Sequence, residues 1–295
     1  MNMPVDPSPP ALENADLTEP GAVAVSVPGS MPRVVQTPVQ ASVQASVDPS
    51  VEPSVDPSVQ ASLQVADSAV DQVIRSRRSV RAFRDQPVSD ELILHLLDVA
   101  ARAPSGTNIQ PWQVHILRGP ALRQLVHRAR AVFDDPVALA AQPKPYDYYP
   151  LNWVSPYLER RRKVGYDLYA LLDIAKGDKA AMHRQHARNF AFFDAPVGLF
   201  FSIDRVLCQG SWLDYGMFLQ TLMVAARGHG LDTCPQAAWL TVQGVVESFL
   251  GLRDDQALVC GMALGYANEE AVENSLRTER VSARSFARFC EASAS

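Results

Sequence analysis

A cluster of basic and hydroxyl side chains occupies residues 74–83, Ile-Arg-Ser-Arg-Arg-Ser-Val-Arg-Ala-Phe. Arg77, Ser79 and Arg81 alternate in sequence, so an extended backbone would direct all three side chains to one face and their apolar neighbours to the other. Arg78 adds a further cation. Guanidinium and hydroxyl donors gathered in this way suit an anion such as a phosphate, because charge-assisted hydrogen bonds are stronger than neutral ones.

A polar loop that contains a glycine follows about one helix later, with the sequence Ala-Pro-Ser-Gly-Thr-Asn-Ile-Gln-Pro-Trp at residues 103–112. Gly106 would allow the backbone to approach a ligand closely. Together with the basic cluster, this loop indicates a flat, phosphorylated heteroaromatic ligand. The alternatives for the cluster are a solvated surface or a nucleic-acid patch. Nucleic-acid binding normally calls for a basic domain, whereas this chain has a formal net charge of −5 and a sequence pI of about 5.7.

The first part of the chain differs in composition from the rest. Residues 1–68 hold eight acidic residues and one basic residue, so the remainder of the chain carries a formal net charge of +2. Residues 39–62 repeat four-residue units such as Val-Gln-Ala-Ser and Val-Asp-Pro-Ser, and prolines at this spacing cannot continue a helix. We therefore expect a disordered, acidic leader rich in Pro, Ser and Val at residues 1–66, and one folded domain at residues 67–295.

The sequence predicts a cytoplasmic protein. The leader has neither a basic start nor a continuous apolar segment, so it does not resemble a secretory signal. The chain has no apolar stretch long enough to span a bilayer. Four cysteines lack metal-ligand spacing and are expected to be reduced, buried thiols: Cys208, Cys234, Cys260 and Cys290.

Hydrophobic patterns in residues 67–295 predict mixed α and β structure. Strands are expected at residues 112–117, 196–203, 231–234 and 257–266, with the third strand broken by Pro235. Helices are expected at residues 66–75, after Ser89, from Pro120, at residues 209–227 and up to Leu250. The strands are too irregularly spaced for a doubly wound nucleotide fold, and no Gly-x-Gly-x-x-Gly occurs.

Two segments stand out within this pattern. Residues 209–227 are apolar around much of the helix circumference, which predicts a helix buried on several sides, either central or at a subunit interface. Residues 133–190 form an irregular excursion with aromatic residues among prolines. We interpret these aromatic side chains mainly as packing, with cover for a flat ligand as the alternative.

Catalytic side-chain constellations are scarce. The sequence has no His-Glu-x-x-His, no Gly-x-Ser-x-Gly and no Walker loop. A protein without its own acid, base or nucleophile often uses a cofactor for the difficult step.

Four motifs occur in a fixed order along the chain. They are Arg-Arg-Ser-Val-Arg-Ala-Phe at 77–83, Ala-Pro-Ser-Gly-Thr-Asn-Ile-Gln-Pro-Trp at 103–112, Gly-Leu-Asp-Thr-Cys-Pro-Gln at 230–236 and Gly-Met-Ala-Leu-Gly-Tyr at 261–266. In this order they resemble the FMN-dependent nitroreductase family over about residues 70–290. The excursion, with Asn-Phe-Ala-Phe-Phe-Asp-Ala-Pro-Val at 189–197, resembles the branch that contains proteobacterial nitrobenzoate reductases.

The resemblance implies roles for individual residues. Arg77, Ser79 and Arg81 would bind the FMN phosphate and ribityl chain, with help from Arg78. A late arginine would complete the phosphate site, for which Arg280 fits best and Arg277 is the alternative. The turn Pro235, Gln236 and Ala237 would place a backbone donor near flavin N5, where it could stabilise the transferred hydride. The loop residues that would reach the flavin of the partner subunit are Pro104, Ser105, Gly106, Asn108 and Gln110.

The resemblance also implies a fold and an activity. The α/β (α+β) fold would have a central, mostly antiparallel sheet flanked by helices, in an intertwined homodimer with two FMN sites. NADPH or NADH would reduce FMN, and a nitroaromatic compound would then be reduced through nitroso to hydroxylamine in a ping-pong mechanism. Tyr146, Tyr149 or Trp153 could form the substrate wall, and an arginine among residues 160–162 could bind a benzoate carboxylate.

Other activities stay open at this stage. Members of the same family reduce quinones or enones, remove halide from aromatic rings, or cleave flavin. A different class would be a flavin-binding protein whose leader recruits a partner. Nucleic-acid binding through residues 75–84 is disfavoured by the nearly neutral charge of the domain, and no membrane partner is expected.

Overall fold

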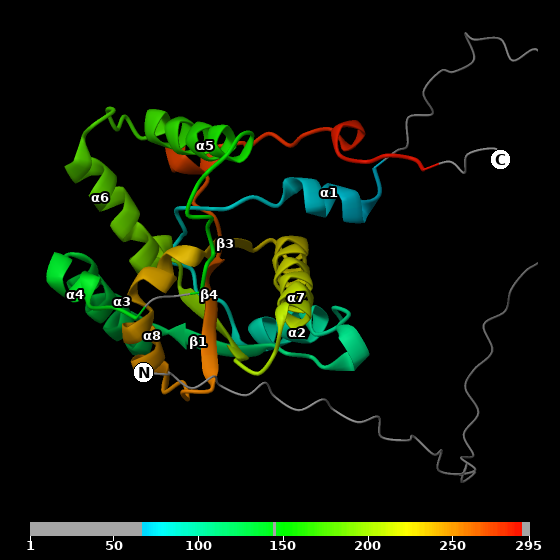
Figure 1. Ribbon diagram of the computed structural model, residues 1–295, viewed down its shortest axis with the longest axis horizontal. Helices are drawn as coiled ribbons and strands as arrows, with labels where there is room; N and C mark the ends of the chain where they lie inside the picture. The colour runs from blue at the N-terminus through cyan, green and yellow to red at the C-terminus, as the bar shows by residue number, and fades with distance from the viewer. Residues whose placement is uncertain (1–66, 144–145, 291–295) are drawn as a thin grey trace, which may run out of the picture. The chain divides into compact units, whose positions relative to one another are not determined.

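A four-stranded antiparallel sheet in the order β1-β2-β4-β3 lies at the centre of the fold (Figure 1). The computed structural model describes residues 67–143 and 146–290. The strands are β1 (Gln113–Arg118), β2 (Val197–Asp204), β3 (Asp232–Gln236) and β4 (Gln256–Gly265). All three strand pairs are antiparallel, which confirms the expected sheet. The predicted leader at residues 1–66 lies outside the described residues.

Helices cover both faces of the sheet, and each face has its own hydrophobic core. The α-helices are α1 (Ala69–Ser76), α2 (Asp90–Ala100), α3 (Gly119–Phe133), α4 (Pro136–Ala140), α5 (Tyr157–Leu171), α6 (Lys179–Ala187), α7 (Gln209–Gly228) and α8 (Gln243–Leu250). Short 3-10 turns are η2 (Gly106–Asn108), η3 (Arg188–Asp194), η4 (Ala237–Val242), η5 (Val272–Ser275) and η6 (Ala283–Ser285). Figure 1 shows α2 and α7 on one side of the sheet and α3, α4 and α8 on the other. Among the described residues, none of the helices combines the length and hydropathy needed to cross a membrane.

The long helix α7 is buried along one stripe rather than on several sides. The buried positions recur every three or four residues, at Ser211, Tyr215, Phe218, Leu222 and Ala226. The side chain of Leu213 is 74% exposed and that of Met217 is 40% exposed. The single chain therefore does not bury α7 on several sides and leaves an apolar surface of the helix uncovered, so the predicted central position is wrong and the alternative of a subunit interface stays a prediction.

Strand β3 continues through Pro235, where the sequence predicted a break. Pro235 pairs in register with Met262 of β4, and the strand ends one residue later. Proline has no N–H to donate, but β3 is at the edge of the sheet, where that donor is not needed for a second neighbour. Pro235 and Gln236, which were predicted to form a turn, are therefore the last two residues of β3.

The four cysteines are unpaired in the structure. Burial raises the pKa of the Cys234 thiol to about 11 and that of Cys260 to about 12. Cys208 and Cys290 are exposed, so the expectation of burial is wrong for these two. Cys208 is the N-cap residue of α7, and Cys290 lies in the C-terminal segment beyond the sheet.

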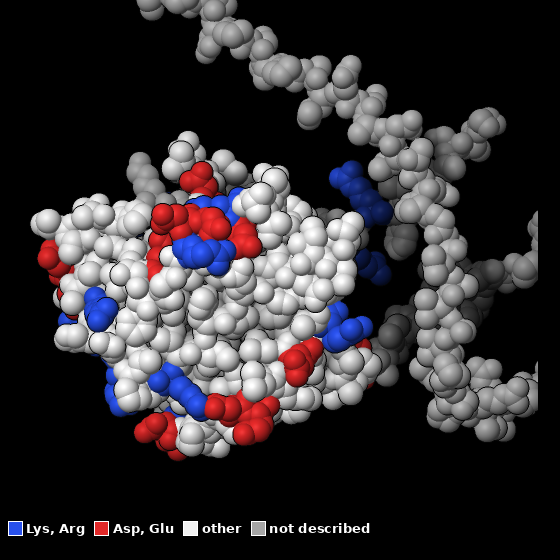
Figure 2. All heavy atoms as spheres, turned by 90° about the horizontal axis from the view of Figure 1, so that it is seen from below, with Lys and Arg blue, Asp and Glu red and all other residues white. Residues whose placement is uncertain are grey.

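Charged side chains are dispersed on the face of the molecule shown in Figure 2. Lys and Arg residues occur there in small groups, several of them next to Asp or Glu, with uncharged surface between the groups. The described salt bridges include Arg253 with both Asp204 and Asp255. This face lacks the continuous basic strip that nucleic-acid binding would require.

Candidate functional site

The basic segment is held in an extended conformation beside strand β3. Ser79 forms a β-bridge with Thr233, and the Val80 backbone N–H donates to the Thr233 carbonyl oxygen over 3.1 Å. Val80 is fully buried, whereas Arg77, Ser79 and Arg81 are half-buried. The predicted alternation is confirmed for residues 79–82, because Val80 and Ala82 are buried whereas Ser79 and Arg81 line a cavity, which Arg77 and Arg78 also line.

This cavity, which we call the basic cavity, has a volume of about 910 Å³. It brings together six of the predicted site residues from both ends of the domain, namely Arg77, Arg78, Ser79, Arg81, Arg277 and Arg280. Arg227 of α7 also lines it and was not predicted. Since the Arg227 guanidinium is paired with the buried carboxylate of Asp232 at 3.1 Å, this arginine is already neutralised by the fold.

Most arginines of the basic cavity have no acidic partner among the described residues. Within the described part of the chain, no carboxylate lies within 4.0 Å of Arg77, Arg81, Arg277 or Arg280. Burial lowers the pKa of the Arg77 guanidinium, and the nearby Arg280 cation lowers it further. Arg78 is paired with Glu269 at 2.6 Å, but its Nε is buried without a partner. Uncompensated cations that repel one another fit a dianionic phosphate such as that of FMN.

Asn274 fixes the position of the basic segment and was missed in the sequence. Its side-chain oxygen accepts from the Arg81 backbone N–H at 2.7 Å, and its Nδ2 donates at 2.8 Å to the carbonyl oxygens of both Ala82 and Asn268. The side chain is 3% exposed. No motif marks this asparagine, because Arg81 and Ala82, which it holds, lie almost two hundred residues away in the sequence.

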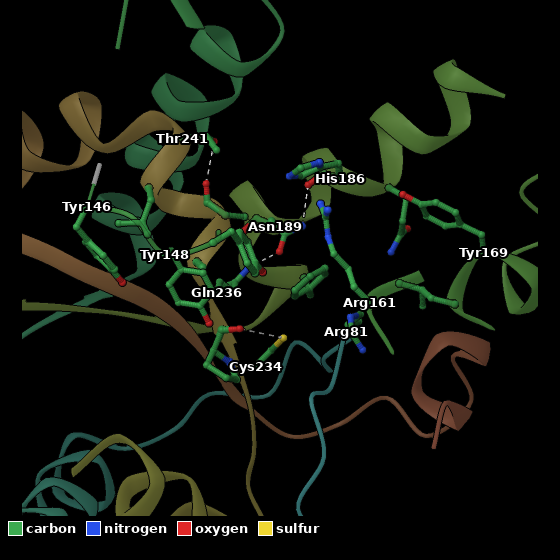
Figure 3. A pocket seen from close by; sticks show the side chains of 18 of the residues that line it. Arg81, Tyr146, Tyr148, Arg161, Tyr169, His186, Asn189, Cys234, Gln236 and Thr241 are labelled. Carbon is green, nitrogen blue, oxygen red and sulfur yellow. Dashed lines mark hydrogen bonds between the residues drawn. The ribbon is translucent and has the colours of Figure 1, made fainter. Parts of the chain in front are cut away.

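A second cavity, which we call the aromatic cavity, adjoins the first through Arg81, which lines both. Its volume is about 680 Å³, and its walls include the predicted turn residues Pro235, Gln236 and Ala237. The aromatic side chains that line it are Tyr146, Tyr148, Tyr149, Tyr169, His186 and Phe193. Figure 3 shows Tyr148, Gln236 and Cys234 on one side and Arg161, Arg81 and Tyr169 on the other.

The tyrosines of the excursion both pack and line the cavity. The Tyr146 hydroxyl donates to the Val259 carbonyl oxygen at 2.8 Å, while its ring faces the cavity. Burial raises the pKa of both Tyr146 and Tyr148. Trp153, a predicted wall residue, does not line the cavity. The interpretation of these aromatic residues mainly as packing was therefore incomplete.

Among the described residues that line the aromatic cavity, no hydrogen bond joins a carboxylate to a histidine. Gln236 donates through Nε2 to the Asn189 carbonyl oxygen at 2.8 Å, which ties β3 to η3. Burial, and secondarily the charge of His183, lowers the pKa of His186, so this imidazole favours its neutral form. The described residues contain no cluster of three or more His, Cys, Asp or Glu that could hold a metal ion. This arrangement suits the binding of a cofactor that performs the chemistry.

The predicted loop at Pro104–Gln110 lines neither cavity of its own chain. The Gly106 backbone N–H donates to Asp214 of α7 at 3.1 Å, and Ser105 Oγ accepts from the Gln110 N–H at 3.0 Å. Asn108 and Gln110 both have positive φ, at 60° and 53°. The structure thus joins this loop to α7 through η2, and keeps Pro104, Ser105, Gly106, Asn108 and Gln110 out of both cavities of the same chain.

Comparison with known proteins identifies the class of protein to which this antiparallel sheet and its two adjoining cavities belong. The sequence profile of the nitroreductase family matches residues 74–266, and the chain belongs to this family. The 4-nitrobenzoate reductase of Pseudomonas putida is 46% identical over 219 residues, which cover 74% of this chain and 94% of that protein. The nitrobenzene nitroreductase of Ectopseudomonas oleovorans is 38% identical, covering 75% and 96%.

A solved structure shows the same fold. The FMN and NADPH-dependent nitroreductase NfnB from Sphigopyxis sp. strain HMH superimposes with a TM-score of 0.71 at 38% identity. The superposition covers 76% of this chain and 100% of that one. The resemblance inferred from the four motifs is therefore confirmed for the family and the fold.

Proposed function

We propose that this protein is an FMN-dependent oxidoreductase that uses NAD(P)H to reduce nitroaromatic compounds to hydroxylamines. The observation that carries this proposal is the group of uncompensated arginines joined through Arg81 to an aromatic cavity. The relatives named above reduce nitroarenes, which supports the same substrate class here. In the overall reaction one nitro group, two NAD(P)H and two protons give one hydroxylamine, two NAD(P)⁺ and one water.

The chain's own residues would bind and orient the reactants. Arg77, Ser79, Arg81 and Arg280 would hold the phosphate and ribityl chain, with Arg277 and Arg78 adding charge. FMN, when bound, supplies hydride transfer between the nicotinamide and the nitro group. The backbone at Pro235, Gln236 and Ala237 would contact the flavin ring, and the tyrosines of the excursion would exclude water from the acceptor.

We also propose that the site is completed by a second copy of the chain in a homodimer. The exposed apolar surface of α7 at Leu213 and Met217 supports this arrangement, since such surfaces often mark interfaces. The Pro104–Gln110 loop packs against α7 through the Gly106 contact with Asp214. A dimer formed across α7 would bring this loop towards the cavities of the partner subunit.

An anaerobic reduction experiment tests the proposed function. The purified protein should be yellow and release FMN on denaturation, and NADPH or NADH should bleach its flavin absorbance. Adding 4-nitrobenzoate should restore the oxidised spectrum, with formation of the hydroxylamine followed by chromatography. A protein that cannot be reconstituted with FMN, or whose flavin stays oxidised with both nicotinamides, would show that the proposal is wrong.

Removal of residues 1–66 should leave the reductase activity intact. The described residues that line the two cavities lie between Ile74 and Arg280, so we propose that residues 67–295 fold and bind FMN without the leader. We expect kcat, KM and FMN content per chain within about twofold of those of the full chain, because the truncation keeps every described residue of the two cavities. A loss of FMN in the truncated protein would contradict this division. If the truncated protein keeps its turnover but no longer binds a partner that the full chain binds, the leader has a recruiting role.

A further inference from the structure

Of three consecutive arginines on helix α5, Arg160, Arg161 and Arg162, only Arg161 lines the aromatic cavity. Arg161 lines the aromatic cavity together with Leu168 and Tyr169 of the same helix. Positions separated by seven or eight residues share one helix face, so this face of α5 is turned towards the cavity. Arg160 instead faces the C-terminal segment. Arg162 lines the space between α5 and α6, which Arg161 also borders, but it does not reach the aromatic cavity.

The guanidinium of Arg161 is positioned by aromatic rings and has no acidic partner. Its central carbon lies 4.7 Å from the ring centre of Trp153 and 5.7 Å from that of Tyr149. In the described part of the chain, no carboxylate lies within 4.0 Å of it. Rings contact the face of a guanidinium, so they leave its in-plane N–H donors free for an anion.

The surroundings of Arg161 favour a flat aromatic anion. The basic cavity already offers four unpaired arginines for a phosphate, and among them only Arg81 also lines the aromatic cavity. The walls beside Arg161 carry the tyrosine rings of residues 146–149 and Tyr169, which suit stacking with an arene. A carboxylate is planar and matches the guanidinium fork through two parallel hydrogen bonds.

We infer that Arg161 is a specificity-determining residue that binds the carboxylate of an anionic nitroarene. This inference rests on the proposed function, because it assigns the substrate class of the same site. Arg161 would hold the acid group at the outer end of the aromatic cavity and leave the nitro group towards the Pro235 turn. Arg161 is solvent-exposed, so we expect an effect at the lower end of the range for charge-assisted hydrogen bonds.

The test compares charged and neutral substrates in matched variants. Arg161→Gln should lower kcat/KM for 4-nitrobenzoate about tenfold, with little change for methyl 4-nitrobenzoate, which lacks the charge. Arg162→Gln removes the same charge one residue further along α5 and should change neither value. Arg161→Lys should recover part of the preference, because it keeps the charge and loses the fork.

A binding measurement separates this inference from the proposed function. Benzoate titrated calorimetrically into the oxidised holoenzyme should bind about tenfold more weakly to the Arg161→Gln variant than to wild type or Arg162→Gln. If wild type reduces neither nitroarene, the proposed function fails, while the benzoate titration still decides the role of Arg161. Equal losses for both nitroarenes, or a raised KM for NADPH with unchanged 4-nitrobenzoate kinetics and benzoate affinity, would overturn the inference. The second of these outcomes would assign Arg161 to the nicotinamide cofactor.

Discussion

Replacement of Arg77 by alanine is expected to give protein that purifies largely without FMN, with its dissociation constant for FMN raised about hundredfold. Arg77 is half-buried in the basic cavity and has no carboxylate partner among the described residues, so the phosphate would be its main counterion. A bidentate bond between a guanidinium and a phosphate comprises two charge-assisted hydrogen bonds. The affinity is measured by titrating FMN into the apoprotein and following quenching of the flavin fluorescence.

The stability of the apoprotein distinguishes this effect from simple unfolding. Burial and the Arg280 cation lower the pKa of Arg77. Without a bound anion, the charge of Arg77 therefore lowers the stability of the fold. The apo form of Arg77→Ala should therefore have a Tm equal to or above that of wild-type apoprotein, whereas FMN should raise its Tm less. Arg84→Ala is the matched control, since Arg84 is exposed and its side chain has no ion pair in the described structure. Undiminished FMN affinity in Arg77→Ala would exclude Arg77 from the site.

The local features of the basic segment could be predicted from sequence because they depend on neighbouring residues. Arg77, Ser79 and Arg81 recur with a period of two, and the burial of Val80 and Ala82 between and after them confirms the signal. The start of the helix predicted after Ser89 is similarly local, because the Ser89 side chain caps the helix by accepting from the Leu92 N–H. The meeting of this segment with Arg277 and Arg280 is not local, and only the family resemblance suggested it.

Features that depend on distant partners were missed or misread. Asn274 stabilises the basic segment through contacts that no sequence spacing reveals. The turn at Phe192 and Phe193 has positive φ at two bulky residues, which propensity disfavours and burial of both rings stabilises. Helix α7 is the opposite case. Its sequence contains more apolar residues than the single chain buries.

Replacement of Gly261 by alanine is expected to destabilise the fold by about 1–3 kcal/mol. A Cβ at this central position of β4 would lie 2.4 Å from Trp239 Cδ1 and 2.9 Å from its Nε1. Trp239 cannot move aside easily, because it is fully buried and its ring contacts Phe192 and Phe200 at centroid distances of 4.6 and 4.9 Å. In a domain of this size such a loss should lower the Tm by roughly 3–10 °C, which thermal denaturation measures.

The same substitution should also weaken FMN binding, because Trp239 is connected to the proposed site. Its Nε1 donates to Gln236 at 3.4 Å, and the turn at Ala237 is two residues away. Gly165→Ala in α5 is the matched control, since its added Cβ meets nothing within 4 Å and alanine favours a helix. Combining Gly261→Ala with Trp239→Phe should cost less than the sum of the two single changes, because the smaller ring removes the clash. Additive losses would show that the Trp239 contact is not the cause.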